Sequence, residues 1–153
     1  MFLEFSELLL RVVLAVLLGA VVGYDRELNE KAAGFRTHIL VCLGAAIFAM
    51  VSLTPDSADQ MRVAAGVVTG IGFLGAGSIF RSKDRVRGLT TAADLLVMAG
   101  IGLAIGIGYY MLAMLSTIAM FIVLLVGRKI DGIILEKKAL LEKSSHAQGK
   151  GRG

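Results

Sequence analysis

The chain has 153 residues, of which 56% are hydrophobic and 18% are charged, and its mean hydropathy is +0.78. Soluble domains carry about 25% charged residues, so this composition predicts a single membrane domain and excludes an ordinary soluble one. The net charge of +4 lies mainly in short loops and the C-terminal tail, and no alternation of aromatic and basic residues suggests a nucleic-acid-binding surface.

Cysteine content and the N-terminus limit the chemistry further. Cys42 is the only cysteine, so no disulfide can form within the chain and no cysteine–histidine metal cluster can be built. The N-terminus lacks a basic region and a small-residue cleavage pattern. We therefore expect the first apolar run to be retained as a helix and not removed as a signal peptide.

Five apolar runs predict an all-α, polytopic membrane protein with five transmembrane helices. Each run has about 15–18 residues, at the short end of the ~20 that span the hydrocarbon core. The runs cover 8–24, 39–53, 63–80, 92–108 and 109–126. The last two are continuous and would project far beyond a bilayer as one helix, so we predict a tight turn at 106–110.

The distribution of lysine and arginine predicts the orientation of these helices. The segment before the first run has none, and the following loops have three, one, four and none. The tail has seven. Because cytoplasmic loops are enriched in basic residues, we predict an N-terminus outside and a C-terminus in the cytoplasm of a bacterial inner membrane.

The residues after the fifth apolar run form a second predicted region, the C-terminal tail. We assign residues 1–126 to the membrane domain and 127–153 to a short basic cytoplasmic tail. Its first part could form a short helix on the inner leaflet, and the polar, glycine-rich end at 144–153 is expected to be disordered. The apolar stripe of that helix would consist of Ile130, Ile133, Ile134 and Leu141.

Three glycine pairs have the G-x-x-x-G spacing, which places two glycines on one helix face and lets a neighbouring backbone approach closely. We expect them to pack the bundle, or to pack it against a second copy or a partner. The alternative is that they allow helices to slide or kink during transport. The pairs are Gly19 and Gly23, Gly66 and Gly70, and Gly102 and Gly106.

The segment 70–75 also matches the dinucleotide motif G-x-G-x-x-G. That motif works at a strand-to-helix turn, and here it lies inside a predicted span, so we reject nucleotide binding. Local unwinding of this segment, which would expose carbonyl groups to an ion, remains an alternative.

Arg11 is a charged residue inside the first apolar run, where charge is costly. Glu7 lies four residues earlier on the same helix face and could pair with it. We expect Arg11 to be paired or to extend toward the headgroups, and a ligand-facing role is the alternative.

The predicted topology brings four polar segments to the cytoplasmic boundary. Part of this pattern is ordinary helix capping and positive-inside anchoring, and the alternative is a functional polar network that binds an anion, a lipid headgroup or a partner protein. The candidate residues are Asp25, Arg26, Glu27, Arg36, Thr37, His38, Arg81, Arg87, Thr90, Thr91 and Asp94.

Two of these candidates have specific readings. Thr91-x-x-Asp94 has the spacing of a capping box at a helix start. His38 is a lone histidine for which a headgroup or network contact is favoured over a metal site. The sequence contains no catalytic arrangement and too few intramembrane carboxylates for a magnesium cage, so we expect no enzyme activity, no cofactor and no bound metal.

The inner-face motifs resemble the signature of the MgtC/SapB family. They are G-Y-D-R-E at 23–27, K-A-A-G-F-R-T-H-I-L-V-C-L-G-A-A-I-F at 31–48, G-I-G-F-L-G-A-G-S-I-F-R at 70–81 and V-R-G-L-T-T-A-A at 86–93. The resemblance covers residues 8–126. It implies an inner-membrane protein of about five spans, linked to growth in low magnesium, intracellular survival of pathogens and acid tolerance.

The resemblance also implies a mode of action. Well-studied members of the family resemble regulators that restrain the F-type ATP synthase, and the label of magnesium transporter derives mainly from genomic context. The chain departs from the family pattern at Leu96, where relatives often have Trp, and at Asp94, where they have a small residue. Many relatives also carry a soluble C-terminal domain, so we expect this chain to be nearer the short SapB-like members.

A transporter or channel for Mg²⁺, protons or another small solute is the rival interpretation. The glycine-rich third and fourth runs and the intramembrane Arg11 favour it. A single five-helix chain is small for a transporter, so this interpretation would require an oligomer.

Overall fold

The computed structural model describes residues 4–53, 60–82 and 85–150, and in these ranges it has five helices and one two-stranded hairpin. Contacts divide the chain into a bundle unit, residues 1–118, and a second unit, residues 119–153. The elements are α1 (Phe5–Leu28), α2 (Phe35–Val51), α3 (Gln60–Gly77), β1 (Phe80–Ser82), β2 (Arg85–Arg87), α4 (Leu89–Ile107) and α5 (Tyr110–Lys150).

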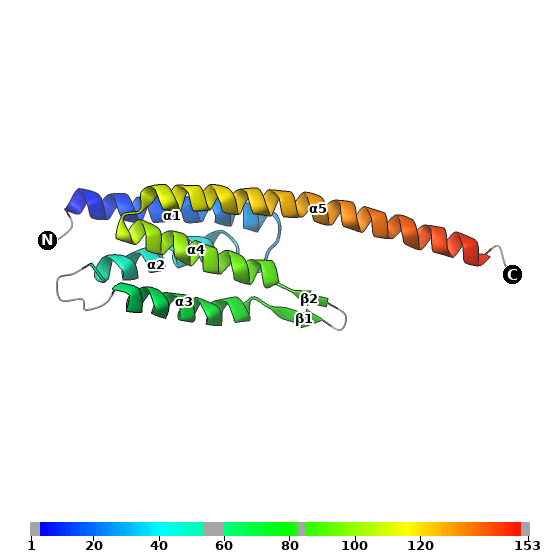
Figure 1. Cartoon of the computed structure of the whole chain (residues 1–153), viewed down its shortest axis with the longest axis horizontal. Helices are drawn as coiled ribbons and strands as arrows, with labels where there is room; N and C mark the ends of the chain where they lie inside the picture. The colour runs from blue at the N-terminus through cyan, green and yellow to red at the C-terminus, as the bar shows by residue number, and fades with distance from the viewer. Residues whose placement is uncertain (1–3, 54–59, 83–84, 151–153) are drawn as a thin grey trace. The chain divides into compact units, whose positions relative to one another are not determined.

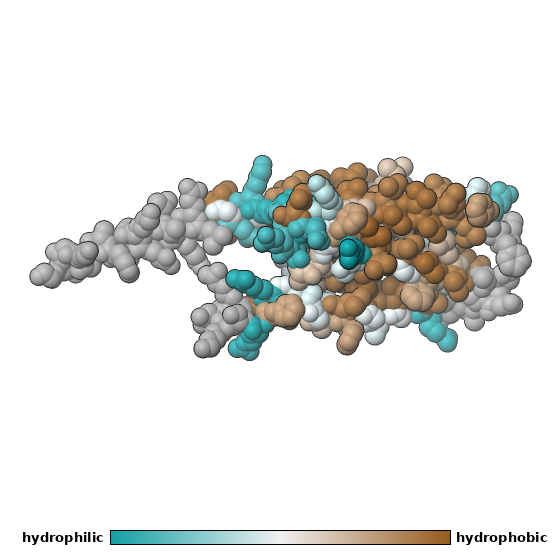
Figure 2. All heavy atoms as spheres, turned by 180° about the vertical axis from the view of Figure 1, so that it is seen from behind, coloured by the Kyte–Doolittle hydropathy of each residue, from teal (hydrophilic) through white to brown (hydrophobic). Residues whose placement is uncertain are grey.

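The helices have the character of membrane helices, which confirms an all-helical membrane protein. Of the described helices, three are long and apolar enough to cross a membrane: α1, α4 and the part of α5 at Tyr110–Ile134. The helix α2 is apolar but shorter, with 17 residues. Many large apolar side chains are exposed, and on the face drawn in Figure 2 they form a broad apolar area.

Within the bundle unit, α2 is the central helix. It packs against α1 on one side and α4 on another, and α3 packs mainly against α4. The side of α2 that faces α1 and α4 is built from small residues, including Cys42, Ala45, Ala46 and Ala49, all of which are buried. Small side chains let the three helix backbones approach closely, which is how membrane helices gain packing energy.

Two of the three glycine pairs lie directly against α2. A Cβ atom at Gly19 would be 2.8 Å from the Cα of Ile39, and one at Gly23 would be 2.8 Å from the Cα of Phe35. On the other side, a Cβ at Gly102 would overlap the carbonyl oxygen of Cys42. Gly106 approaches α2 in the same way, at the carbonyl of Ala46.

The third pair makes no close contact within the described part of the chain, and its packing against a second copy or a partner stays a prediction. A Cβ added at Gly66 or Gly70 would meet no atom within 4 Å. The contact of α3 with α4 instead uses Gly75, whose added Cβ would lie 3.4 Å from that of Ala92. The helix α3 therefore contacts α4 through a different face from the one that carries Gly66 and Gly70.

A short hairpin joins α3 to α4 and was not predicted (Figure 1). The third apolar run was expected to extend to Phe80, but α3 ends at Gly77 and Phe80 begins β1. The strands are antiparallel, with Phe80 opposite Arg87 and Arg81 opposite Val86. The hairpin gives the backbone of this loop hydrogen-bond partners of its own.

The predicted turn between the fourth and fifth runs is confirmed. The helix α4 ends at Ile107, and Gly108 follows in the left-handed region with φ of +100°. The amide groups of Gly108 and Tyr109 donate to the carbonyl oxygen of Ala104, at 3.1 and 2.7 Å. Glycine is favoured at this position because other residues are strained at positive φ.

The tail differs from the expectation. The helix α5 continues to Lys150 without a separate short helix, and residues 144–150, which we expected to be disordered, are helical. The remaining residues, 151–153, lie outside the described ranges. In the expected apolar stripe, Ile130, Ile133 and Ile134 are exposed, and the side chain of Leu141 is not among those described.

Candidate functional site

A buried ion pair joins α1 to α4 inside the bundle. The Nη2 atom of Arg26, in the last turn of α1, donates to Oδ2 of Asp94 on α4. The two residues are only 2% and 4% exposed. A charged pair removed from water to this extent pays a large desolvation penalty, so buried charges are retained mainly where they are paired.

The position of Asp94 corrects the capping-box interpretation. The N-cap of α4 is Gly88, with φ of +93°, and no side chain makes a capping hydrogen bond there. Asp94 therefore lies beyond the first turn and its carboxylate points to Arg26. Thr91 is also buried, at 3% exposure, and does not cap the helix.

His38, on α2, is a further buried polar residue. Its side chain is fully buried, and its Nδ1 atom lies 2.9 Å from the carbonyl oxygen of Gly34. Because a carbonyl oxygen can only accept, Nδ1 carries the hydrogen and Nε2 is left as an acceptor. His38 also interacts electrostatically with Asp94 and Arg26. We call Arg26, His38 and Asp94 the polar core cluster.

Two atoms of the polar core cluster lack hydrogen-bond partners. Among the described residues, neither Nε2 of His38 nor Nε of Arg26 has a partner, and both atoms are buried. In the neutral imidazole Nε2 is an acceptor, and Nε of Arg26 is a donor. An unsatisfied polar group is costly when it is buried, which makes this cluster the strongest functional candidate in the bundle.

Glu27 has a structural role beside the cluster. Its Oε2 atom accepts a hydrogen bond of 2.9 Å from the backbone N–H of Phe35, the first residue of α2. A carboxylate at a helix N-terminus satisfies a free amide and interacts favourably with the helix dipole. The carboxylate also lies against Gly34, where an added Cβ would overlap it and force the Glu27 side chain to shift.

The remaining candidates are closer to the surface, so the structure divides the predicted set into two groups. Asp25 and Thr37 are half-buried, and the others are exposed. None of these residues joins the buried ion pair. The exposed candidates are Arg36 on α2, Arg81 and Arg87 on the hairpin, and Thr90 on α4.

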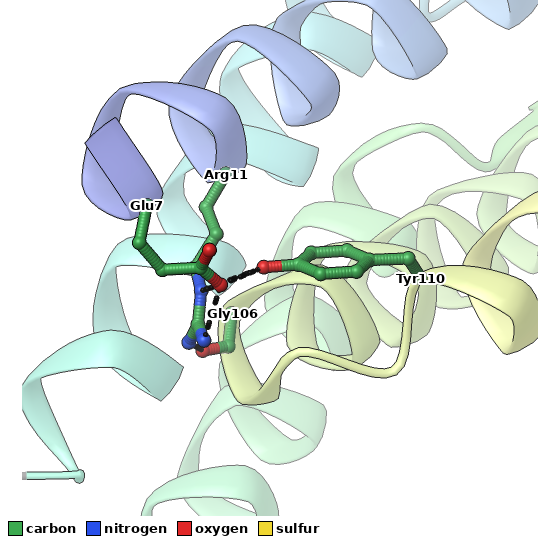
Figure 3. Close-up of polar contacts among 4 residues, drawn as sticks. All are labelled: Glu7, Arg11, Gly106 and Tyr110. Atoms are coloured by element: carbon green, nitrogen blue, oxygen red, sulfur yellow. Dashed lines mark hydrogen bonds and ion pairs between the residues drawn. The ribbon is translucent and has the colours of Figure 1, made fainter. Parts of the chain in front are cut away.

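A second polar cluster surrounds Arg11. Figure 3 shows its guanidinium group held between α1 and the turn that precedes α5. Its Nη2 atom pairs with Oε1 of Glu7 at 2.9 Å, as expected from the sequence. Its Nε atom donates to the hydroxyl of Tyr110 at 3.1 Å, and its Nη1 atom donates to the carbonyl oxygen of Gly106. The Tyr110 hydroxyl in turn donates to Glu7.

We call Glu7, Arg11 and Tyr110 the outer cluster. Tyr110 was not identified from the sequence as a functional candidate, although it lies in the predicted turn at 106–110. Its position at the start of a helix, beside a tight turn, is the signal that could have revealed it, because Tyr combines an apolar ring with a hydrogen-bonding end. Among the described residues, no group of three or more His, Cys, Asp or Glu side chains could hold a metal ion.

Comparison with known proteins identifies the same family as the sequence motifs. The profile of the MgtC family matches residues 12–133. The putative magnesium transporter YhiD of Escherichia coli K12 is 37% identical over 146 residues, covering 90% of this chain and 68% of YhiD. Protein MgtC of Salmonella typhimurium strain 14028s is 46% identical over 110 residues, covering 72% of this chain and 48% of that protein.

Protein MgtC of Brucella abortus strain 2308 is similar to the same degree, with 45% identity over 105 residues, 68% of this chain and 44% of that protein. The chain thus spans about half the length of these MgtC proteins. No solved structure matches it. The family profile covers most of the chain, including every residue of the polar core cluster, and the chain therefore belongs to the MgtC family.

Proposed function

We propose that this chain is a multi-pass protein of the bacterial inner membrane with five spans, an outer N-terminus and a cytoplasmic C-terminus. The exposed apolar side chains and the alternation of basic residues between loops support this topology. In this orientation the polar core cluster and the hairpin lie toward the cytoplasm, and the outer cluster lies toward the opposite face.

Labelling of single cysteines tests the topology. With Cys42 replaced by Ala, a cysteine at the exposed position Glu4 should react with an impermeant reagent added outside the cell. A cysteine at Arg87 should react only after the membrane is permeabilised. The reverse pattern would contradict the proposed orientation.

We infer that the protein acts without enzymatic chemistry and supports adaptation to low magnesium or acid stress. The relatives named MgtC and putative magnesium transporter YhiD support this physiological setting. We further propose that it works by regulating a membrane partner, such as the F-type ATP synthase. The observation that carries the proposal is the polar core cluster, because an ionisable cluster inside a membrane bundle is costly and is retained mainly where it serves function.

The role of the polar core cluster can be tested in a strain whose growth in low magnesium depends on this protein. The double variant Arg26→Gln/Asp94→Asn removes both charges without leaving either one unpaired, so the bundle should still insert. We expect it to lose growth in low magnesium at normal membrane levels, whereas the matched exposed variant Lys137→Gln should grow normally. Normal growth of the double variant would contradict the proposal.

The alternative is transport of Mg²⁺ or another small solute, which the name of the relative YhiD, putative magnesium transporter, favours. Purified protein in liposomes tests it directly. Mg²⁺ flux that an Arg36→Ala variant abolishes would establish a transporter. Absence of flux from folded protein would favour the regulator, and crosslinking in cells should then recover a membrane partner, with the ATP synthase as the first candidate.

A further inference from the structure

An apolar groove of about 710 Å³ runs between α2 and α3. Its walls are aliphatic and aromatic side chains, and glycines form part of its floor on both helices: Gly44 on α2, and Gly66 and Gly70 on α3. A Cβ added at any of these three glycines would meet nothing within 4 Å. The groove is therefore open because side chains are missing there, and its volume is typical of a site for one small molecule.

The length of the groove matches one leaflet of a bilayer. On α2 it extends from Thr37 to Phe48, and on α3 from Leu74 back to Val63. Eleven helical steps correspond to about 16 Å, and half of a hydrocarbon core of about 30 Å is 15 Å. A partner helix that crosses the membrane would need a track along the whole core, whereas an acyl chain occupies one leaflet.

A polar pocket shares one lining residue with an end of the groove. Thr37 lines both the groove and a second cavity of about 620 Å³, which Arg36, Tyr24 and Glu27 also line. Arg36 is exposed, and its guanidinium forms no ion pair within the described part of the chain. Glu27 is occupied by the backbone N–H of Phe35. The pocket therefore places a cation and a hydroxyl, together with the Glu27 carboxylate that binds this amide, near the end of the apolar groove that Thr37 lines.

We propose that the groove and this pocket together bind one anionic phospholipid. The acyl chain lies along Gly66 and Gly70, and the phosphate is held by the guanidinium of Arg36 and the hydroxyl of Thr37. Both residues are in the first turn of α2, whose dipole favours an anion and where Glu27 already accepts from the N–H of Phe35. In the proposed orientation, the lipid belongs to the cytoplasmic leaflet, where anionic headgroups attract basic side chains.

Native mass spectrometry of the full chain tests the proposal, with phosphatidylglycerol and phosphatidylethanolamine of identical acyl chains as probes. Wild type should retain phosphatidylglycerol in preference to phosphatidylethanolamine. Gly70→Leu fills the groove and should lower retention of both lipids by about tenfold, since loss of only two buried methylene groups has that effect. Arg36→Gln should leave the groove intact but reduce the preference for phosphatidylglycerol by about fivefold.

Gly72→Leu is the matched control. Gly72 is also a helical glycine of α3 with no atom near its added Cβ, but it does not line the groove, so lipid retention should equal that of wild type. Equal retention by Gly70→Leu and Gly72→Leu would overturn the proposal. A dimer that Gly70→Leu dissociates, with bound lipid unchanged, would overturn it in favour of a second copy. Because the measurement is bound lipid, its failure is distinguishable from failure of the growth test.

Discussion

The two sides of α2 differ in how the neighbouring helices meet them. On the closed side, Gly19 and Gly102 bring α1 and α4 against the α2 backbone, and the polar core cluster is buried between the three helices. On the open side, Gly66 and Gly70 face α2 across an apolar groove. The same G-x-x-x-G spacing therefore gives a tight interface on one side and an open channel on the other.

This difference indicates what each side can do. The polar residues on the closed side are buried, so charges placed there act strongly on one another. The open side can accept a ligand without moving a helix, because its space already exists. Three substitutions sharpen the contrast, and they are ordered from the largest expected effect to the smallest.

The largest effect is expected for Asp94→Ala on the closed side. It leaves the guanidinium of Arg26 buried and unpaired, and removing one partner of a buried pair typically destabilises by about 3–5 kcal/mol. Denaturation of the purified protein in detergent, followed by circular dichroism, measures the loss. The variant Arg26→Met/Asp94→Leu removes both charges and should recover most of the stability. An unchanged midpoint in Asp94→Ala would show that the pair is not buried as described.

An intermediate effect is expected for Gly102→Ala, also on the closed side. Its new methyl group would overlap the carbonyl oxygen of Cys42, so α4 must move away from α2. Overpacking of this kind costs about 1–3 kcal/mol. The same denaturation measurement applies, and a variant as stable as wild type would contradict the close contact of α2 and α4.

The smallest effect is expected for Gly66→Ala on the open side. The methyl group enters empty space, and alanine is favoured over glycine in a helix by about 1 kcal/mol. We therefore expect unchanged or slightly raised stability. Destabilisation comparable with that of Gly102→Ala would mean that α3 approaches α2 as closely as α4 does, and the groove would then not exist.

The outer cluster provides a second contrast with the polar core cluster. Arg11 directs hydrogen bonds to Glu7, Tyr110 and the carbonyl of Gly106, so it ties α1 to the turn before α5. In the polar core cluster, by contrast, His38 and Arg26 each keep one unsatisfied buried atom. Every polar side chain of the outer cluster is hydrogen-bonded, whereas the polar core cluster keeps two buried atoms that have no partner among the described residues.

The sequence by itself determined the membrane class, the helical runs, the turn within 106–110 and the pairing of Arg11 with Glu7. Each depends on local information: hydropathy along the chain, the length of the apolar runs, and the i, i+4 spacing on a helix. The family membership also followed from short contiguous motifs. The hairpin and the continuation of α5 to Lys150 were missed, because three-residue strands and polar helix ends carry little hydropathy signal.

Only the tertiary structure decided which polar residues meet. The spacing of Asp94 from Thr91 fits a cap, but the start of α4 at Leu89 places Asp94 inside the helix, where Arg26 from 68 positions earlier in the chain pairs with it. Likewise, the three glycine pairs have the same spacing, and only the placement of α3 against α4 left Gly66 and Gly70 open. Spacing fixes which residues share a helix face, whereas the partner of that face depends on how separate helices pack.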